Sequence, residues 1–307
     1  MFVRLLNNHK EERNKMIDLH IHTKYSDGTD EVLTILKKAE EKNLKYISIT
    51  DHNNCDAYKE LENIDITKYY SGKIITGVEL NTKALGIPIE ILGYGIDVKE
   101  INLKLKHTYL TAKERNKIEL ERLYKKCIQA NIKLPDNFIE NYDYNTYASK
   151  YLHKEITNNF MNKNLIDEES WNNSNIFYRK YMSNPNTMFF VDTDDILPDF
   201  ETASNLITDT GGLVFIPHIY EYRDNANKIL DYILKHYEIQ GIECYYTTFT
   251  KEQSNHLIKI CKEKKLFMSG GSDYHGSFKP DVDMAIGKGD LSVSENIVEP
   301  WIYYVNN

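Results

Sequence analysis

The sequence contains no long uninterrupted run of apolar residues. A membrane-spanning helix needs about 18 or more such residues in a row, and no segment of this 307-residue chain approaches that length. The first residues, Met1 to Lys10, have neither a long apolar stretch nor a small-residue cleavage site, so we expect no secretory signal. These absences argue against a membrane-spanning or secreted protein and favour a cytoplasmic one.

Cysteine is scarce, and basic charge is not in excess. The 4 cysteines are scattered without a Cys-x-x-Cys pair, so we expect reduced thiols and neither a disulfide framework nor a thiolate zinc site. The formal net charge of −8 argues against stable binding of duplex nucleic acid, which a general basic field would favour. Phosphorylated substrates remain compatible with this charge, because bound metal ions can reverse its sign locally.

Strand-like and helix-like segments alternate in two separate parts of the chain. Residues 16–98 contain β-branched runs and an amphipathic helix over 29–43, and the alternation returns in residues 201–307. Residues 99–200 have a mostly helical pattern, with a capping-box sequence at Thr111 to Glu114. Because such alternation is typical of a parallel sheet or barrel, we predict an α/β barrel formed by the two outer parts and interrupted by a helical insertion.

Histidine and acidic side chains are found where the predicted strands end. His20 and His22 close the first strand, and residues i and i+2 of a strand face the same side. Further such residues are Asp27 in the next turn, His52, Glu79 at the end of a strand predicted over 73–80, His218, Asp273 and His275. The carboxyl ends of barrel strands share one face, where active sites are built. Unpaired polar groups would be costly to bury there, so we predict a shared metal site.

The ligand types restrict the metal and the chemistry. Imidazole and carboxylate without thiolate suit zinc, manganese or iron, and the number of ligands predicts two or three divalent ions. Such ions can generate hydroxide from water and hold both the attacking and the leaving oxygen of a phosphoester. The chain has no Gly-x-Ser-x-Gly nucleophile elbow. The expected nucleophile is therefore hydroxide formed at the metal ions, without a covalent intermediate on the protein.

These motifs resemble those of the PHP (polymerase and histidinol phosphatase) superfamily of metal-dependent phosphoesterases. The resemblance is carried by Asp18 to Gly28, Ile49 to Asn53, Gly77 to Glu79, Pro217 to His218 and Gly271 to Gly276. The segment from Gly241 to Gln253 is similar to the stand-alone branch, which cleaves nucleoside bisphosphates and trims oligonucleotides from the 5′ end. The resemblance implies a distorted TIM-like (β/α)7 barrel and a phosphatase or 5′-3′ exonuclease that acts on a small phosphorylated substrate or a short oligonucleotide.

The resemblance also implies three metal positions. One ion would take His20, His22, Glu79 and Asp273, a second would take Asp27, His52 and His275, and a third would share Glu79 and use His218. Relatives usually complete the third position with a histidine on the following strand, where this chain has Glu90. As a ligand, Glu90 would favour manganese or iron over zinc. The alternative is that Glu90 is not a ligand and only two ions bind tightly.

The insertion does not identify the residues that bind the phosphate. Relatives carry an arginine-containing phosphate-gripping motif there, and residues 144–154 contain no clear counterpart. The candidates are Arg115, Lys150, Lys154 and Arg179, with ordinary surface charge as the alternative for each.

Two other activities compete with phosphoester hydrolysis. An amidohydrolase-type C–N hydrolase also begins with His-x-His on a barrel strand. Such enzymes commonly use a modified lysine to bridge their metal ions, whereas in this chain Glu79 is better placed to form the bridge. The second alternative is a regulatory module that keeps the metal site but does not catalyse a reaction. The presence of Glu90 in place of the usual histidine is the one sequence feature that favours it. Clustered buried charges would burden a protein that bound no metal.

Overall fold

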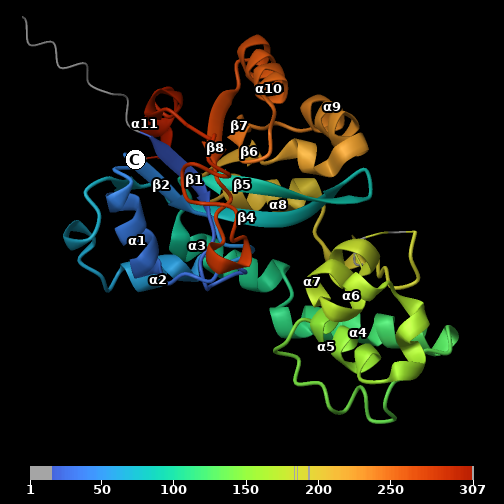
Figure 1. Cartoon of the computed structure of the whole chain (residues 1–307). Coiled ribbons are helices and arrows are strands. Elements are labelled where there is room, and N and C mark those ends of the chain that lie inside the picture. The colour runs from blue at the N-terminus through green and yellow to red at the C-terminus, as the bar shows by residue number, and fades with distance from the viewer. Residues whose placement is uncertain (1–15, 183, 185, 193, 306–307) are drawn as a thin grey trace, which may run out of the picture. The chain divides into compact units, whose positions relative to one another are not determined.

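The computed structural model describes residues 16–182, 184, 186–192 and 194–305. The chain forms two compact units (Figure 1). The first combines the residues up to Leu105 with those from Pro198 onward, and the second is Lys106–Leu197. No helix in the described part of the chain is both long and apolar enough to cross a membrane.

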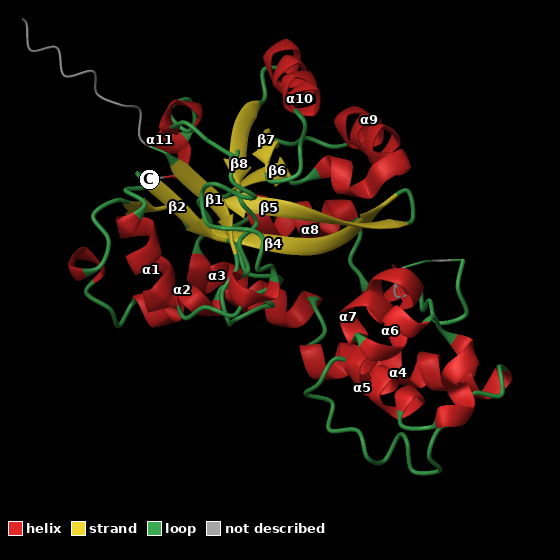
Figure 2. Ribbon diagram, in the orientation of Figure 1, coloured by secondary structure: helices red, strands yellow, loops and turns green. Residues whose placement is uncertain are grey.

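The first unit contains two β-sheets (Figure 2). Their strands are β1 (Ile17–Ile21), β2 (Tyr46–Ile49), β3 (Lys73–Ile74), β4 (Gly77–Ala84), β5 (Ile87–Tyr94), β6 (Leu213–Ile216), β7 (Gly241–Tyr246) and β8 (Phe267–Gly271). One sheet has the order β1-β2-β3 and the other β4-β5-β6-β7-β8. The pairs β4–β5 and β5–β6 are antiparallel, whereas the other pairs are parallel. The fold is thus mixed α/β, and its sheet topology is not that of a closed, all-parallel barrel.

The prediction of one strand over 73–80 is wrong, because this segment contains β3 and the beginning of β4. β4 continues to Ala84 and pairs with β5 through a two-residue connection, Leu85 and Gly86, with φ of 55° and 73°. Positive φ at both central residues is typical of the tight turns that match the twist of paired strands. Glu79 therefore lies near the start of a hairpin strand and not at a strand end.

Isolated bridges join the two sheets where the predicted site residues lie. Ile21 at the end of β1 forms a parallel bridge with Tyr274 after β8, and His52 after β2 forms one with Glu79 of β4. Gly271 lets β8 approach β1, since a Cβ atom there would lie 2.5 Å from the backbone nitrogen of His20. The bridges bring the residues that follow β8 next to the end of β1, and those that follow β2 next to β4.

Helices cover the sheets of the first unit. They are α1 (Val32–Glu41), α2 (Asp56–Leu61), α3 (Val98–Thr108), which runs into the second unit, α8 (Phe200–Thr208), α9 (Ala226–His236), α10 (Lys251–Lys264) and the short α11 (Ile302–Val305). α1 buries Val32, Ile35, Leu36 and Ala39, the spacing of one helical face. Trp301 stacks on Tyr94 in a buried core that also contains strand residues such as Leu19 and Phe215.

The second unit is helical and has its own core. Its helices are α4 (Ala112–Gln129), α5 (Ala148–Thr157), α6 (Glu168–Asn172) and α7 (Ser174–Phe177). The predicted capping box is confirmed, because the Thr111 side chain accepts from the Glu114 backbone while the Glu114 side chain accepts from that of Thr111. Phe138 and Leu152 are fully buried in this core.

Candidate metal centre

The structure brings all the predicted metal-binding side chains into one connected cluster. They come from β1 and its following turn (His20, His22, Asp27), the end of β2 (His52), the hairpin (Glu79, Glu90), the end of β6 (His218) and the end of β8 (Asp273, His275). Each has a side-chain nitrogen or oxygen within 4.0 Å of an oppositely charged partner in the set. Residues far apart in the sequence thus form one site.

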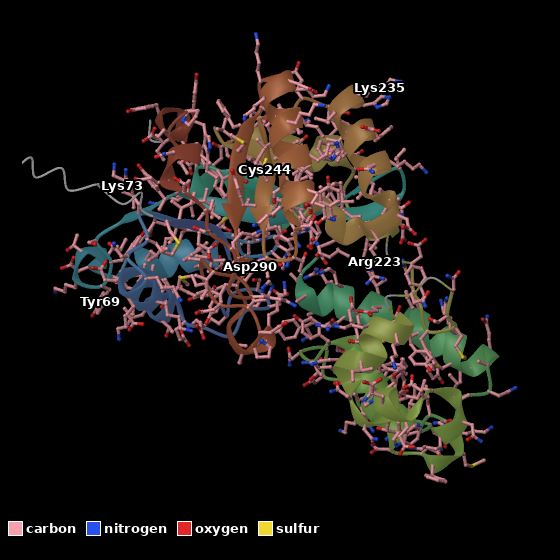
Figure 3. The ribbon with its side chains drawn as sticks, turned by 45° about the horizontal axis from the view of Figure 1, so that its top comes forward. Tyr69, Lys73, Arg223, Lys235, Cys244 and Asp290 are labelled. Carbon is pink, nitrogen blue, oxygen red and sulfur yellow. The ribbon has the colours of Figure 1, made fainter. Side chains whose placement is uncertain are left out.

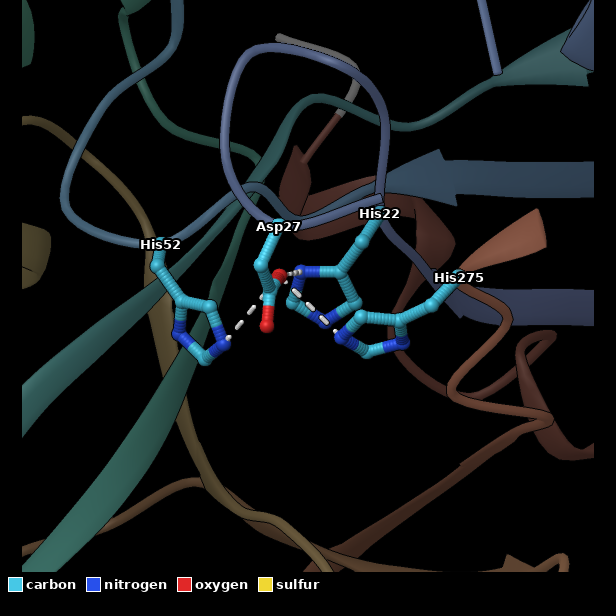
Figure 4. Close-up of side chains that lie close together, drawn as sticks. All are labelled: His22, Asp27, His52 and His275. Atoms are coloured by element: carbon cyan, nitrogen blue, oxygen red, sulfur yellow. Dashed lines mark ion pairs between the residues drawn. The ribbon is translucent and has the colours of Figure 1, made fainter. Parts of the chain in front are cut away.

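Three overlapping groups in the described residues have the geometry to hold an ion. They are His22, Asp27, His52 and His275 (Figure 4); His20, His22 and Glu79; and His52, Glu79 and Glu90. Within each group, the ligand atoms lie within 4.8 Å of one another. The groups differ from the sets expected from the sequence: His22 joins the Asp27 group, and His52 takes the place of His218 beside Glu90. Asp273 and His218 belong to none of the three groups but lie 3.3 Å from His22 and 2.9 Å from Glu79, respectively.

Glu79 occupies the middle of the cluster. Its Oε2 atom lies 3.1 Å from Nε2 of both His20 and His22 and 3.4 Å from Nδ1 of His52. Its Oε1 atom lies 2.9 Å from Nε2 of His218. One carboxylate, 1% exposed, therefore faces imidazoles on both sides, as a bridging ligand would.

Glu90 lies between two of these histidines. Its Oε2 atom is 3.4 Å from Nε2 of His218, and its Oε1 atom is 3.8 Å from Nδ1 of His52. The backbone N–H of Glu90 donates to the Tyr222 hydroxyl at 2.8 Å, and the Asn81 amide donates to Oε1 at 3.2 Å. The carboxylate is thus held at the cluster and faces its ligand atoms.

Several buried polar atoms of the cluster make no hydrogen bond of acceptable geometry within the described residues, although three of them face oppositely charged groups. They include His22 Nε2, 3.1 Å from Glu79 Oε2; Asp27 Oδ1, 3.1 Å from His275 Nε2; His52 Nδ1, 3.4 Å from Glu79 Oε2; and His218 Nδ1. Buried polar atoms without a partner are costly and rare, and each of these atoms can donate a lone pair to a cation. A set of imidazoles and carboxylates suits zinc, manganese and iron, so the cluster fits divalent metal ions.

The electrostatics of the cluster point the same way. Burial alone would raise the pKa of Glu79, but the imidazoles of His20 and His52 hold it well below its usual range. Burial alone would lower the pKa values of His22 and His218, but the facing carboxylates raise them to about 10 and about 9. The carboxylates thus impose a strongly negative field on the cluster, which divalent cations would neutralise.

Two cluster residues have unusual backbone conformations. His218 has a φ of 21° and Asp273 a φ of 57°. Positive φ is unfavourable for residues other than glycine and is retained mainly at functional sites, where the surrounding structure enforces it. Here it turns both side chains into the cluster directly after β6 and β8.

Glu243 contacts the cluster, although the sequence did not single it out as a site residue. This residue of β7 is fully buried; its Oε1 atom lies 3.0 Å from Nδ1 of His20, and its Oε2 atom accepts from the His218 backbone at 2.8 Å. A carboxylate on the second ring nitrogen orients an imidazole and raises its basicity as a ligand. The available signal was an acidic residue inside an apolar strand, since such residues are almost never buried without a partner.

Replacing Glu243 with glutamine is expected to weaken metal binding about 10- to 100-fold, the usual effect of losing such a supporting group. Chelator competition measures the affinity for Mn²⁺. Glu238→Gln, at an exposed position just before β7, is the matched control and should leave the affinity unchanged. Equal affinities for Glu243→Gln and the parent would contradict the supporting role.

Asp51 and Asp18 support the cluster without facing it directly. Asp51 accepts from the Thr23 backbone at 2.8 Å and from the Ser26 hydroxyl at 2.6 Å, and this hydroxyl lies 3.3 Å from Nδ1 of His22. Asp18 accepts from the backbone and hydroxyl of Ser272 at 2.9 and 2.5 Å. Asp51 thus orients the loop after β1, whereas Asp18 ties β1 to the end of β8.

The candidate phosphate-binding residues from the sequence all lie in the second unit. Arg115 is in α4, Lys150 and Lys154 are in α5, and Arg179 lies in the helical turn Tyr178–Met182. Lys150 is placed over the ring of Tyr147, at 5.7 Å from its centroid. Binding of phosphate by these residues stays a prediction.

A lysine that the sequence analysis did not single out lies at the cluster itself. The side chain of Lys279 approaches Asp273, with Nζ 2.5 Å from Oδ2. Burial alone would lower the pKa of Lys279, but this ion pair raises it above its usual value. The ammonium group therefore stays charged beside the carboxylates.

Comparison with known proteins identifies the family. The model of the PHP domain matches residues 18–181, just over half of the chain, and the protein belongs to this family. A 5′-3′ exoribonuclease of Haemophilus influenzae is 26% identical over 290 residues, which cover 94% of this chain and 98% of the relative. A phosphoribosyl 1,2-cyclic phosphate 1,2-diphosphodiesterase of Eggerthella lenta is 22% identical over 265 residues, covering 85% and 94%.

Solved structures share the fold. A candidate metal-dependent phosphoesterase from Bifidobacterium adolescentis superimposes with a TM-score of 0.67 at 16% identity, over 94% of this chain and 96% of that one. An amidohydrolase from Chromobacterium violaceum, solved with bound sulfate and no metal, gives a TM-score of 0.60 at 20% identity, over 85% and 88%. At these identities the likeness establishes the fold alone.

Proposed function

We propose that this protein is a metal-dependent phosphoesterase that hydrolyses a phosphomonoester or the terminal phosphoester of a nucleotide or short oligonucleotide. The observation that carries the proposal is the position of Glu79. Its two oxygens face the imidazoles of His20, His22, His52 and His218 at 2.9 to 3.4 Å. A shared carboxylate at this position can bridge neighbouring cations, the arrangement used to cleave phosphoesters with two or more metals.

The cluster residues divide into ligands and groups that position ligands. His20, His22 and Glu79 would hold one ion, with Asp273 beside them. His22, Asp27, His52 and His275 would hold a second, and Glu79, Glu90 and His52 a third, with His218 at 2.9 Å from Glu79 beside them. Divalent ions bound there would supply Lewis acidity, which activates water and offsets charge on the phosphoryl oxygens. Glu243 keeps Nε2 of His20 directed at Glu79, and Asp51 fixes the loop that carries His22 and Asp27.

Features outside the ligand set bear on the fold, the substrate class and the metal. The bridges from Ile21 to Tyr274 and from His52 to Glu79 support our interpretation of the two sheets as a strongly distorted barrel with hydrogen-bonding gaps. The names of the Haemophilus and Eggerthella relatives both describe enzymes that cleave phosphoester bonds, which supports a phosphoester substrate. We propose manganese or iron as the preferred metal, because Glu90 adds a hard anionic ligand.

A substrate screen with the manganese-loaded protein tests this function. The substrates are p-nitrophenyl phosphate, nucleoside 3′,5′-bisphosphates and short RNA with a 5′ phosphate, and the readouts are phosphate and nucleotide release. We expect turnover of at least one phosphoester and none of amides or cyclic ureides. Hydrolysis of C–N bonds alone would support an amidohydrolase, and the absence of any turnover would support a module that binds metal without catalysis.

Replacing Glu90 with glutamine tests the third metal position. The amide oxygen is a weaker ligand than the carboxylate. We therefore expect this variant to retain fewer Mn²⁺ ions per chain than the parent after gel filtration. Elemental mass spectrometry measures the manganese content. Glu62→Gln, at an exposed position after α2, provides the control. Unchanged occupancy in Glu90→Gln would refute a ligand role for Glu90.

A further inference from the structure

Asp273 presents its two oxygens to different partners. Oδ1 faces the imidazoles, at 3.3 Å from Nε2 of His22 and 3.3 Å from Nδ1 of His275. Oδ2 accepts from the Tyr246 hydroxyl at 2.8 Å and from Nζ of Lys279 at 2.5 Å. The ammonium group of Lys279 is therefore separated from the proposed metal ligands by a single carboxylate.

The backbone around Lys279 is held in place. Gly276 has a φ of 63°, and a Cβ atom there would lie 2.3 Å from Thr29 Oγ1. The Ser277 N–H donates to the same Thr29 oxygen at 2.8 Å. The Lys279 N–H donates to the Gly276 carbonyl at 3.3 Å, and the Lys279 carbonyl accepts from Val282 at 3.0 Å. The loop thus fixes the base of the lysine side chain beside the cluster.

The ammonium group has unused donors. It carries three N–H bonds, and in the described part of the chain Asp273 Oδ2 is the acceptor found for it. The Lys279 side chain is 30% exposed, compared with 8% for Asp273. The lysine thus extends from a buried carboxylate towards solvent.

We propose that Lys279 is a substrate-binding residue, whose free N–H groups donate to the non-bridging oxygens of a phosphate bound at the metal centre. The proposal rests on the phosphoesterase function proposed above and names the group of this chain that receives the phosphate. Lysine serves at such sites as a point charge. The resulting preference is for the doubly charged phosphate of a monoester or of a nucleotide terminus, because attraction grows with the charge of the ligand.

Calorimetry and kinetics on the manganese-loaded protein test the proposal. Lys279→Met should bind inorganic phosphate about 10- to 100-fold more weakly than the parent, the usual effect of losing a hydrogen bond from a charged group, and should raise KM for p-nitrophenyl phosphate. Its manganese content should equal that of the parent. Lys279→Arg should recover most of the phosphate affinity, because it restores the charge. Lys42→Met is the control, since Lys42 pairs with the exposed Asp283 at 2.7 Å, and it should change neither measurement.

The outcomes separate this proposal from the function on which it rests. Unchanged phosphate affinity in Lys279→Met would overturn the proposal, and so would a joint loss of manganese and phosphate, which would make Lys279 a positioning residue for Asp273. If Lys279→Met does not fold, Lys279→Gln carries the same test. If the parent hydrolyses no phosphoester, the proposed function fails, while the calorimetry with inorganic phosphate still decides the role of Lys279.

Discussion

Replacing His20 with alanine is expected to lower phosphoester turnover by at least about 10²- to 10³-fold, the range found when one group that stabilises transition-state charge is removed. His20 is fully buried, and its two ring nitrogens face Glu79 at 3.1 Å and Glu243 at 3.0 Å. Alanine therefore removes a proposed ligand and leaves two buried carboxylates without this partner. Initial rates on the best phosphoester from the screen, together with the metal content, measure the effect.

The matched control for this experiment is His236→Ala. His236 is exposed at the end of α9, where its ring contacts the Tyr232 carbonyl at 2.8 Å, and its loss should leave turnover and metal content unchanged. Equal phosphate release by His20→Ala and the parent would show that the centre is wrongly assigned. A variant that keeps its full metal content but loses turnover would locate the function of His20 in the reaction and not in metal retention.

Replacing Asp18 with alanine is expected to destabilise the first unit by more than about 3 kcal/mol, because each buried donor left without a partner costs about 1–3 kcal/mol. Asp18 is fully buried. It accepts from the backbone and hydroxyl of Ser272 at 2.9 and 2.5 Å, and from the Ala285 backbone at 2.7 Å. Urea denaturation, followed by tryptophan fluorescence, measures the change in the free energy of unfolding.

Asp290→Ala is the control for this loss of stability. Asp290 is an exposed residue of the first unit (Figure 3), and exposed substitutions usually change the free energy of unfolding by no more than about 0.5 kcal/mol. A shift of similar size in both variants would mean that Asp18 does not hold β1 and the end of β8 together. The destabilisation should also be present in metal-free protein, because Asp18 accepts from the Ser272 hydroxyl and from the backbones of His20, Ser272 and Ala285, and from no side chain of a proposed metal ligand.

Local patterns were sufficient to predict the main elements. The helix predicted over 29–43 contains α1, and the predicted capping box at Thr111 to Glu114 stands at the start of α4. The failure at residues 73–80 has a physical reason. Whether an apolar run forms one strand or two depends on the partner with which it pairs, and β4 pairs with β5, which follows it in the chain.

The sequence by itself determined which chemistry this protein can perform. The proposed ligands follow from the spacing of His20 and His22 and from the Asp273-Tyr274-His275 segment, with Glu79 and Glu90. Backbone periodicity decides locally which of these imidazole and carboxylate side chains share a face. Only the tertiary structure decided how these groups are supported. Glu243 lies 223 positions from His20 in the sequence, and Lys279 reaches Asp273 through a loop that Thr29 holds in place. Such contacts are set by packing between distant segments, which no local pattern encodes.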